Sequence, residues 1–453
     1  MIKTSAIFLF LNYCLGKKVD MSIVVAKIDW RQLYTFASRQ AVLGFCFDGI
    51  ERLTKEFSEE LKQNPMGRDL LMTWMGASQQ IRRQNMKVNA VASKLYSKFR
   101  EDGLRCCLLK GQGNALMYPN PYSRTPGDID VWVNASREDI TDYAKTHFEI
   151  GDDIRFHHLE TTMDGVPVEL HFFPCSMNNP IYHARLQKWF RRNADLQCSH
   201  IVGLPDGAGD IAIPTTAFNV IYQLTHLYHH FFDEGIGMRQ IIDYFLVVND
   251  FSKNVFLNNK SSKITPSLFT LKEGSTSHPD PLSLRGEGGN RPTRCSEPLR
   301  SKDGGPSKVS PDCAGWDRLS IEGDNSAGSA TAVTSSASTA LDVVQRELKY
   351  LGLWKFAGAV MYVLHEALGL SEEKMIAPMD EKRGKLLLEE ILNGGNFGQH
   401  FTKYGHFTQQ GMAKKYFLKI WRNMHFVRYY PAEALSEPIF RTWHFFWRIK
   451  NKK

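Results

Sequence analysis

The stretch GDIDVWV (127–133) places two aspartates in what otherwise has the composition of a buried strand. Ile129 and Val131 are β-branched, which favours a strand. Because side chains at i and i+2 of a strand point to the same face, we expect Asp128 and Asp130 to stand side by side. Two carboxylates that close repel each other unless a cation lies between them. The stretch therefore predicts either a cation site or an exposed strand end with solvated acids.

Strand and helix patterns alternate around this stretch. GLRCCLLKG (103–111) and VPVELHFF (166–173) have the composition of strands, and QGNALMYP between them predicts a short helix. SREDITDYAKTHF (136–148) begins with a serine that can cap a helix and has two acids in the first turn. This alternation predicts a small mixed sheet, and we assign residues 103–213 to an α/β core.

Helical patterns flank this core on both sides. Residues 29–102, 214–254 and 341–453 contain apolar residues at helical spacing. Residues 255–340 are rich in Ser, Gly, Pro and Thr, a composition that buries too little surface to offset the entropy of ordering. The fold class that we expect is α+β: a small mixed β-sheet core with N-terminal helices and a C-terminal helical region, interrupted by a disordered insertion.

The N-terminal 20 residues have a composition of their own. Residues 6–16, AIFLFLNYCLG, resemble the core of a signal peptide but are too short to span a bilayer. Since no small-residue cleavage site follows, we favour translation from Met21, with residues 1–20 a non-native or flexible extension. No other stretch is long enough for a transmembrane segment, and the eight cysteines include no CxxC pair. These features predict a cytoplasmic protein with reduced thiols.

VPVELHFF adds a third carboxylate to the two aspartates. Alternation along this strand places Glu169 and His171 on one face. If the strand pairs beside GDIDVWV, Glu169 joins Asp128 and Asp130 in an all-oxygen site of the kind that binds Mg²⁺. A pair of such ions activates an attacking hydroxyl and holds the oxygens of a triphosphate. The sequence thus predicts two Mg²⁺ ions, with Mn²⁺ as the alternative, and transfer of a nucleotide with pyrophosphate leaving.

Three motifs follow one another along this part of the chain: Leu-Lys-Gly at 109–111, Arg-x-x-Gly-Asp-Ile-Asp at 124–130 and Glu-Leu-His at 169–171. Their order and spacing resemble those of an uncharacterised bacterial nucleotidyltransferase family of the DNA polymerase β-like nucleotidyltransferase superfamily. The later segments HLYHH and GMRQIID also look familial. The resemblance covers roughly residues 29–250 and 340–440.

The resemblance implies that Asp128, Asp130 and Glu169 are catalytic residues that bind the metal. Glu169 is in addition the expected base toward the acceptor hydroxyl. In the superfamily, a Gly-Ser turn usually precedes the two aspartates and holds the triphosphate. Lys110 and Gly111 occupy that turn here, so this chain departs from the family pattern at the point where phosphate is positioned.

Further residues near the three motifs are candidates for binding the nucleotide. They are Lys110, Gly111, Gln112, Gly113, Arg124 and His171. Lys110 and Arg124 offer positive charge, the amides at the predicted helix start offer hydrogen bonds to phosphate, and His171 lines the site or orients a ligand. Each also has a structural interpretation, as a strand end in water, a polar loop residue or a buried histidine.

Two helical motifs keep two interpretations each. His226, His229 and His230 have the i, i+3, i+4 spacing that binds zinc, but no cysteine or acid nearby completes the pattern, so zinc is the less favoured interpretation. Arg239 and Asp243 are four residues apart, which predicts either an ion pair along a helix or a contact with substrate.

The C-terminal segment combines basic and aromatic residues. Residues 401–453 contain 11 Lys and Arg against two acids, Glu433 and Glu437, and 14 aromatic residues. One interpretation is an anionic partner: nucleic acid, anionic lipid or a phosphorylated substrate. The other, which we favour for the aromatic residues, is a helical domain with an aromatic core and solvated basic side chains.

These features together predict a metal-dependent nucleotidyltransferase. It would move a nucleoside monophosphate from a nucleoside triphosphate donor to a hydroxyl acceptor, which can belong to a protein, a small molecule or RNA. The alternative is a non-catalytic nucleotide- or partner-binding protein on the same scaffold. Three intact carboxylates favour the enzyme, and the unusual Lys-Gly turn keeps the alternative open.

Overall fold

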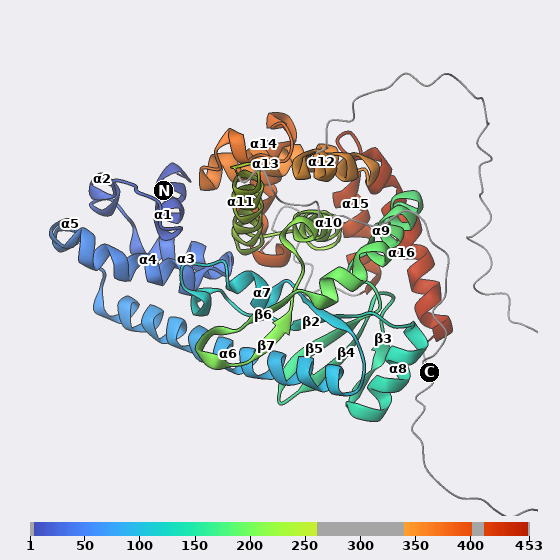
Figure 1. Ribbon diagram of the computed structural model, residues 1–453. Helices are drawn as coiled ribbons and strands as arrows, with labels where there is room; N and C mark the ends of the chain where they lie inside the picture. The colour runs from blue at the N-terminus through green and yellow to red at the C-terminus, as the bar shows by residue number, and fades with distance from the viewer. Residues whose placement is uncertain (1–3, 261–338, 401–411, 452–453) are drawn as a thin grey trace, which may run out of the picture. The chain divides into compact units, whose positions relative to one another are not determined.

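A five-stranded sheet is the centre of the computed structural model, which describes residues 4–260, 339–400 and 412–451 (Figure 1). The strands are β1 (Cys106–Leu109), β2 (Ile129–Val133), β3 (Ile150–Ile154), β4 (His158–Met163) and β5 (Val166–His171), in the spatial order β1-β2-β5-β4-β3. β2 and β5 are parallel, and the other neighbours are antiparallel. The predicted small mixed sheet is therefore confirmed.

One face of the sheet forms a hydrophobic core with α6 (Arg68–Glu101) and α8 (Arg137–His147). The core includes Val88, Leu95 and Phe99 of α6, Ile140 and Ala144 of α8, and Ile129, Val131, Val168 and Leu170 of the sheet. Because side chains alternate along a strand, burying these residues sends Asp130 and Glu169 to the opposite face. A shift of one residue in the pairing would exchange the two faces, so the core determines where the carboxylates lie.

Local sequence signals explain several of these elements. The Ser136 hydroxyl accepts a hydrogen bond from the Asp139 amide and caps α8, as predicted. Asp164 and Gly165 both have positive φ, which suits the tight turn that joins β4 to β5. The predicted short helix is α7 (Gly111–Ala115).

The helices before the sheet are α1 (Thr4–Cys14), α2 (Ser22–Val25), α3 (Trp30–Arg39), α4 (Leu43–Glu56), α5 (Ser58–Gln63) and α6. Residues 4–14 belong to the segment interpreted as a non-native or flexible extension, but here they form a packed helix. Phe10 and Leu11 are buried, and the Asn12 amide donates to the carbonyl of Ala367 at 3.1 Å. Apolar residues of this segment are therefore packed within the fold.

The helices after the sheet are α9 (Pro180–Ser199), α10 (Thr216–Asp233), α11 (Met238–Lys260), α12 (Ala340–Tyr350), α13 (Trp354–Leu368), α14 (Glu381–Gly394), α15 (Met412–Met424) and α16 (Pro431–Asn451). A two-stranded ribbon, β6 (Ile201–Gly203) and β7 (Asp210–Ala212), lies between α9 and α10 in sequence. α11 continues to Lys260, inside the range predicted for the insertion, and residues 261–338 of that range lie outside the described residues. In the part of the chain that is described, no helix combines the length and the apolar character needed to cross a membrane.

α9 and α10 cover part of the polar face of the sheet through aromatic contacts. Trp132 of β2 stacks on Phe218 of α10 with ring centroids 6.0 Å apart, and Phe218 stacks on Trp189 of α9 at 4.6 Å. These stacked aromatic rings cover the sheet face around Trp132. Beyond them the face opens into a cavity.

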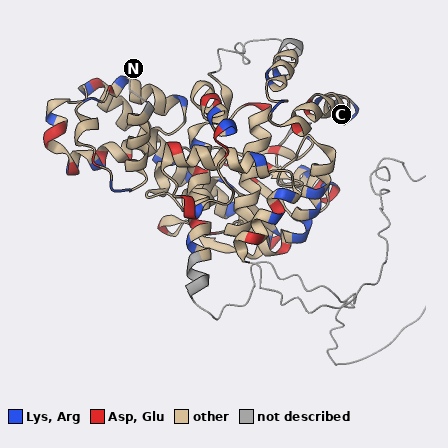
Figure 2. Ribbon diagram, turned by 90° about the horizontal axis from the view of Figure 1, so that it is seen from above, with Lys and Arg blue, Asp and Glu red and all other residues tan. Residues whose placement is uncertain are grey.

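Ion pairs hold part of the basic charge of the C-terminal helices. Asp233 of α10 lies 2.9 Å from both Lys419 of α15 and Arg441 of α16. Figure 2 shows Lys and Arg interspersed with Asp and Glu over most of the described helices. The aromatic residues divide into two groups, because Phe426 is buried whereas Phe417 is 68% exposed. The predicted aromatic core therefore accounts for only part of the segment, and the anionic partner stays a prediction.

Glu433 of α16 fastens the loop that follows β5. Its carboxylate accepts hydrogen bonds from the amides of Asn178 and Asn179, at 2.6 Å and 3.2 Å, just before α9 begins. Burial raises the pKa of Glu433 to about 7, although the two amides act in the opposite direction. The group therefore binds a proton in the folded chain at pH values where it is ionised in the unfolded chain.

The effect of pH on stability is expected to differ between the wild type and Glu433→Gln. Because the native state binds more protons between pH 4.5 and about 7, the free energy of unfolding of the wild type falls with rising pH by about 3 kcal/mol relative to the variant. Denaturant unfolding across this range measures the difference. Glu381→Gln, at an exposed acid of α14, should keep the wild-type pH slope, and equal slopes in wild type and Glu433→Gln would contradict the assignment.

Candidate active site

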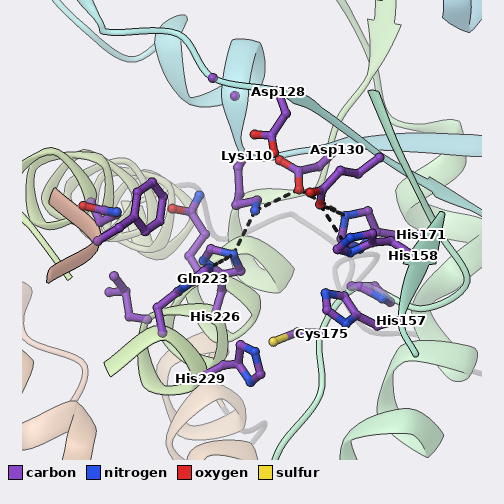
Figure 3. A pocket seen from close by; sticks show the side chains of 18 of the residues that line it. Lys110, Asp128, Asp130, His157, His158, His171, Cys175, Gln223, His226 and His229 are labelled. Carbon is purple, nitrogen blue, oxygen red and sulfur yellow. Dashed lines mark hydrogen bonds and ion pairs between the residues drawn. The ribbon is translucent and has the colours of Figure 1, made fainter. Parts of the chain in front are cut away.

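A cavity of about 320 Å³ lies over the polar face of the sheet (Figure 3). The residues that line it come from the ends of β1, β2, β4 and β5 and from α10 and α11. They include Lys110, Gly111, Arg124, Asp128, Asp130, His157, His158, Glu169, His171, Cys175, Gln223, His226, His229, His230, Arg239 and Asp243. The cavity thus gathers carboxylates, imidazoles and basic side chains that are far apart in the sequence.

The three predicted carboxylates lie together at this cavity. Asp130 is opposite Glu169 in the parallel pairing of β2 and β5. Asp128 precedes the first residue of β2 and lines the cavity. His171 Nε2 is 3.1 Å from Asp130 Oδ1 and 3.2 Å from Glu169 Oε2. Since ionised carboxylates only accept hydrogen bonds, His171 Nε2 carries a proton and donates to both carboxylates.

The positive groups nearby compensate the charge of Asp130 better than that of Asp128. The charge of Asp130, together with burial, raises the pKa of Asp128 to about 6. Burial alone would raise the pKa of Asp130 as well, but Lys110 and His171 lower it below the usual value. Asp130 is therefore ionised at neutral pH, whereas Asp128 is ready to accept a further cation.

Lys110 is the internal counter-ion of Asp130. Its Nζ lies 3.0 Å from Asp130 Oδ1 and 2.8 Å from His226 Nε2 of α10. Its φ of +52° is in a region that favours glycine, and Gly111 follows with φ of +44°. A lysine that keeps such a conformation carries backbone strain, which proteins retain mainly at functional positions. The Lys-Gly turn thus aims a positive charge at the carboxylates.

Two of the predicted nucleotide-binding residues, Gln112 and Gly113, are not among the residues that line the cavity. The Gln112 side chain is buried and donates to Asn89 Oδ1 of α6. A Cβ at Gly113 would come within 2.9 Å of the Ile213 side chain, so close packing explains this glycine. Their side chains therefore have structural contacts, and only a role of their backbone amides stays a prediction.

Arg124 is buried in an ion pair with Asp243 of α11. Its Nε and Nη2 donate to the two carboxylate oxygens at 2.9 Å and 2.8 Å, and Tyr118 donates to the same carboxylate at 2.7 Å. Burial would raise the pKa of Asp243, but the Arg124 guanidinium lowers it below the usual value. Arg124 is thus a loop residue, as its structural interpretation predicts, and its buried side chain joins the loop before β2 to α11.

Arg239 is a basic residue of α11 that lines the cavity. The ion pair that its spacing allowed with Asp243 does not form, because Asp243 binds Arg124 instead. Arg239 Nη1 donates to the carbonyl of Thr125 at 3.1 Å, while its buried Nε has no hydrogen-bond partner. Burial lowers the pKa of Arg239, and no carboxylate among the described residues pairs with it.

The cavity contains histidines that the sequence analysis did not single out. His157 and His158 precede and begin β4, and burial lowers the pKa of both, so that they are neutral at pH 7. The sequence signal for these histidines is the run FHHLE at 156–160. Their position at the cavity, however, depends on the pairing of β4 with β5, which the run itself does not specify. The Nε2 atoms of His226 and His230 lie 3.0 Å apart. Among the described residues, His226, His229 and His230 do not form a group whose ring nitrogens all lie close enough together to hold one metal ion.

Comparison with known proteins identifies the family. Residues 26–265, more than half of the chain, match the family described as an uncharacterised nucleotidyltransferase, and the chain belongs to this family. An antigenic nucleotidyltransferase-like protein from Paracoccidioides brasiliensis, known from a crystal structure, is 17% identical over 36% of this chain and 75% of that chain, with a TM-score of 0.25. A search of the curated proteins finds no match. Family membership supports a role in nucleotidyl transfer, while the bacterial origin and the superfamily stay predictions.

The Arg124–Asp243 pair is expected to be a major contribution to stability. In Asp243→Asn the buried guanidinium loses its counter-charge, and we expect the free energy of unfolding to fall by about 3–5 kcal/mol in denaturant titrations. Asp195→Asn removes the carboxylate of an exposed pair with Arg105 and should cost under about 1 kcal/mol. Similar losses in the two variants would contradict the role of the buried pair.

Proposed function

We propose that this chain is a metal-dependent nucleotidyltransferase that moves a nucleoside monophosphate from a nucleoside triphosphate to a hydroxyl acceptor and releases pyrophosphate. The observation that carries the proposal is the register of β2 and β5, which puts Asp130 opposite Glu169 at a cavity that Asp128 also lines. Family membership supports the same reaction class.

The residues present suit divalent metal ions. Asp130, Glu169 and His171 each offer one ligand atom within 4.8 Å of the other two. The raised pKa of Asp128 indicates negative charge that lacks a partner. Asp128, Asp130 and Glu169 would hold two Mg²⁺, or Mn²⁺ in their place, since these hard ions prefer oxygen ligands. Bound there, the ions would supply charge stabilisation to the triphosphate and to the attacking oxygen.

Two basic side chains would receive the triphosphate. Lys110, which follows β1, and Arg239 of α11 line the same cavity. Arg239 has donor capacity to spare, because its Nε has no hydrogen-bond partner. Arg124 acts as a positioning residue, since its guanidinium is committed to Asp243. This division of roles differs from the sequence-based prediction, in which Arg124 binds phosphate.

Transfer would proceed by attack of the acceptor oxygen on the α-phosphorus. The new phosphorus–oxygen bond forms as the bond from the α-phosphorus to the pyrophosphate oxygen breaks, and pyrophosphate leaves with that electron pair. Glu169 would take the proton of the acceptor hydroxyl. Although burial acts against it, hydrogen bonding from His171 lowers the pKa of Glu169, so the carboxylate is ionised and able to accept.

One observation favours the alternative, a non-catalytic nucleotide-binding protein. Lys110 Nζ lies 3.0 Å from Asp130 Oδ1, where its charge already compensates a predicted metal ligand. If Lys110 kept this position with nucleotide bound, the chain would bind a nucleotide without transferring it. The transfer experiment below separates the two.

Magnesium-dependent labelling tests the proposed reaction. The wild type, incubated with each α-labelled nucleoside triphosphate and cell lysate as the pool of acceptors, should transfer label to a protein, a small molecule or RNA. Asp130→Asn should lower the rate at least about a hundredfold, because the reacting phosphate loses preorganised charge stabilisation. Asp142→Asn, at an exposed acid of α8, should label at the wild-type rate.

The outcome decides between enzyme and binding protein. Label that appears with the wild type and disappears in Asp130→Asn supports transfer and identifies the acceptor class. Equal nucleotide binding by the two proteins, with no label from any nucleotide, would instead support the binding protein.

Removing the Arg239 guanidinium should weaken nucleotide binding. A charge-assisted hydrogen bond to phosphate contributes about 1.5–3 kcal/mol, so Arg239→Ala should raise the KM for the triphosphate about tenfold or more. Arg239→Lys should recover part of the loss. Arg346→Ala, at an exposed arginine of α12, provides the matched control, and an unchanged KM in Arg239→Ala would exclude this phosphate contact.

A further inference from the structure

Three histidines converge on the wall of the cavity beside the carboxylates. His157 lies just before β4, His158 begins β4, and His171 ends β5, directly opposite His158 in the antiparallel pairing. One ring nitrogen of each lies within 4.8 Å of those of the other two. Figure 3 shows the three rings together on the side of the cavity away from Lys110.

The backbone holds these rings in place. The amide of Phe172 donates to the carbonyl of His157 at 3.0 Å, and the amide of Arg155 donates to the carbonyl of His158 at the same distance. The ladder between β4 and β5 fixes the third ring relative to the second. The cluster is therefore a preformed part of the sheet edge.

Several ring nitrogens of the cluster make no hydrogen bond. His171 directs Nε2 to Asp130 and Glu169, while its buried Nδ1 has no hydrogen-bond partner. His158 is 3% exposed, and neither of its ring nitrogens has a hydrogen-bond partner. Buried polar atoms are nearly always hydrogen-bonded, so these nitrogens indicate a ligand that they would bind.

We propose that His157, His158 and His171 form a binding site for a transition-metal dication such as Zn²⁺. Imidazole nitrogen prefers these ions to Mg²⁺, which prefers oxygen. A histidine that binds metal usually donates its other ring N–H to a carboxylate, and His171 does so toward Asp130 and Glu169. The nearby Glu160 adds negative charge 3.6 Å from His158 Nε2.

The proposed site is chemically distinct from the oxygen site. Its ligands are three nitrogens, and Asp130 and Glu169 lie beside these ligands: both contact His171 Nε2, and Glu169 Oε2 also lies 3.4 Å from His158 Nδ1. Three protein ligands leave one position open toward the cavity, as in zinc sites that bind water or a substrate oxygen. A hydroxyl bound there would lose its proton more readily, which suits an acceptor. The binding of the ion does not depend on the proposed transfer reaction.

Cobalt provides the test, because Co²⁺ in a nitrogen site absorbs visible light and Zn²⁺ does not. The full chain, freed of metal by a chelator, is titrated with Co²⁺ in a large excess of Mg²⁺. We expect one Co²⁺ per chain, and loss of the absorption when Zn²⁺ is added. His157→Ala and His158→Ala should each weaken Co²⁺ binding by about tenfold or more.

Two control variants separate this site from its surroundings. His147→Ala, at an exposed histidine of α8, should bind Co²⁺ as the wild type does. Asp128→Asn should keep the Co²⁺ absorption while losing nucleotidyl transfer, so the failure of one proposal is visible without the other. If circular dichroism shows that His158→Ala is unfolded, His158→Gln replaces it. Absence of Co²⁺ absorption in the wild type, or its persistence in both histidine variants, would overturn the proposal.

Discussion

The parallel pairing of β2 and β5 is the interaction on which the site depends. It places Asp130 opposite Glu169, while the apolar residues between them are buried against α6 and α8. The register is thus determined on one face of the sheet and used on the other. A shift in the pairing would expose the buried apolar residues, so the register is fixed. The register keeps two carboxylates from segments about 40 residues apart as neighbours, and no bond between the two side chains is required.

Electrostatic balance is the second constraint. The cavity brings three acids together and compensates them unequally, since Lys110 and His171 stabilise the charge of Asp130 but leave Asp128 with a raised pKa. The strained backbone of Lys110 costs about 1–3 kcal/mol, which the packing around the turn has to offset. Arg239, which donates to a backbone carbonyl and lies over the ring of Phe397, adds a positive charge to the cavity lining.

Much of the sheet and the acidic cluster was predictable, because both depend on local alternation. The alternation in GDIDVWV and VPVELHFF predicts that Asp128, Asp130 and Glu169 share one face of the sheet. Ser136, followed by two acids, predicts the start of α8. The roles of Arg124 and Arg239 were not predictable, since the two arginines compete for Asp243 only once α11 is folded over the loop. The histidine cluster depends likewise on the pairing of β4 with β5, which no local pattern specifies.

The bond from Glu433 to the loop after β5 has a consequence for the order in which the site is completed. Asn178 and Glu433 are 255 residues apart, and Cys175 and Ser176, which line the cavity, lie in that same loop. During synthesis the sheet emerges from the ribosome long before α16 does, so the loop lacks its hydrogen bonds to Glu433 until α16 has emerged. The nascent chain therefore carries a formed sheet with an incomplete cavity, and the site matures only when synthesis of α16 is finished.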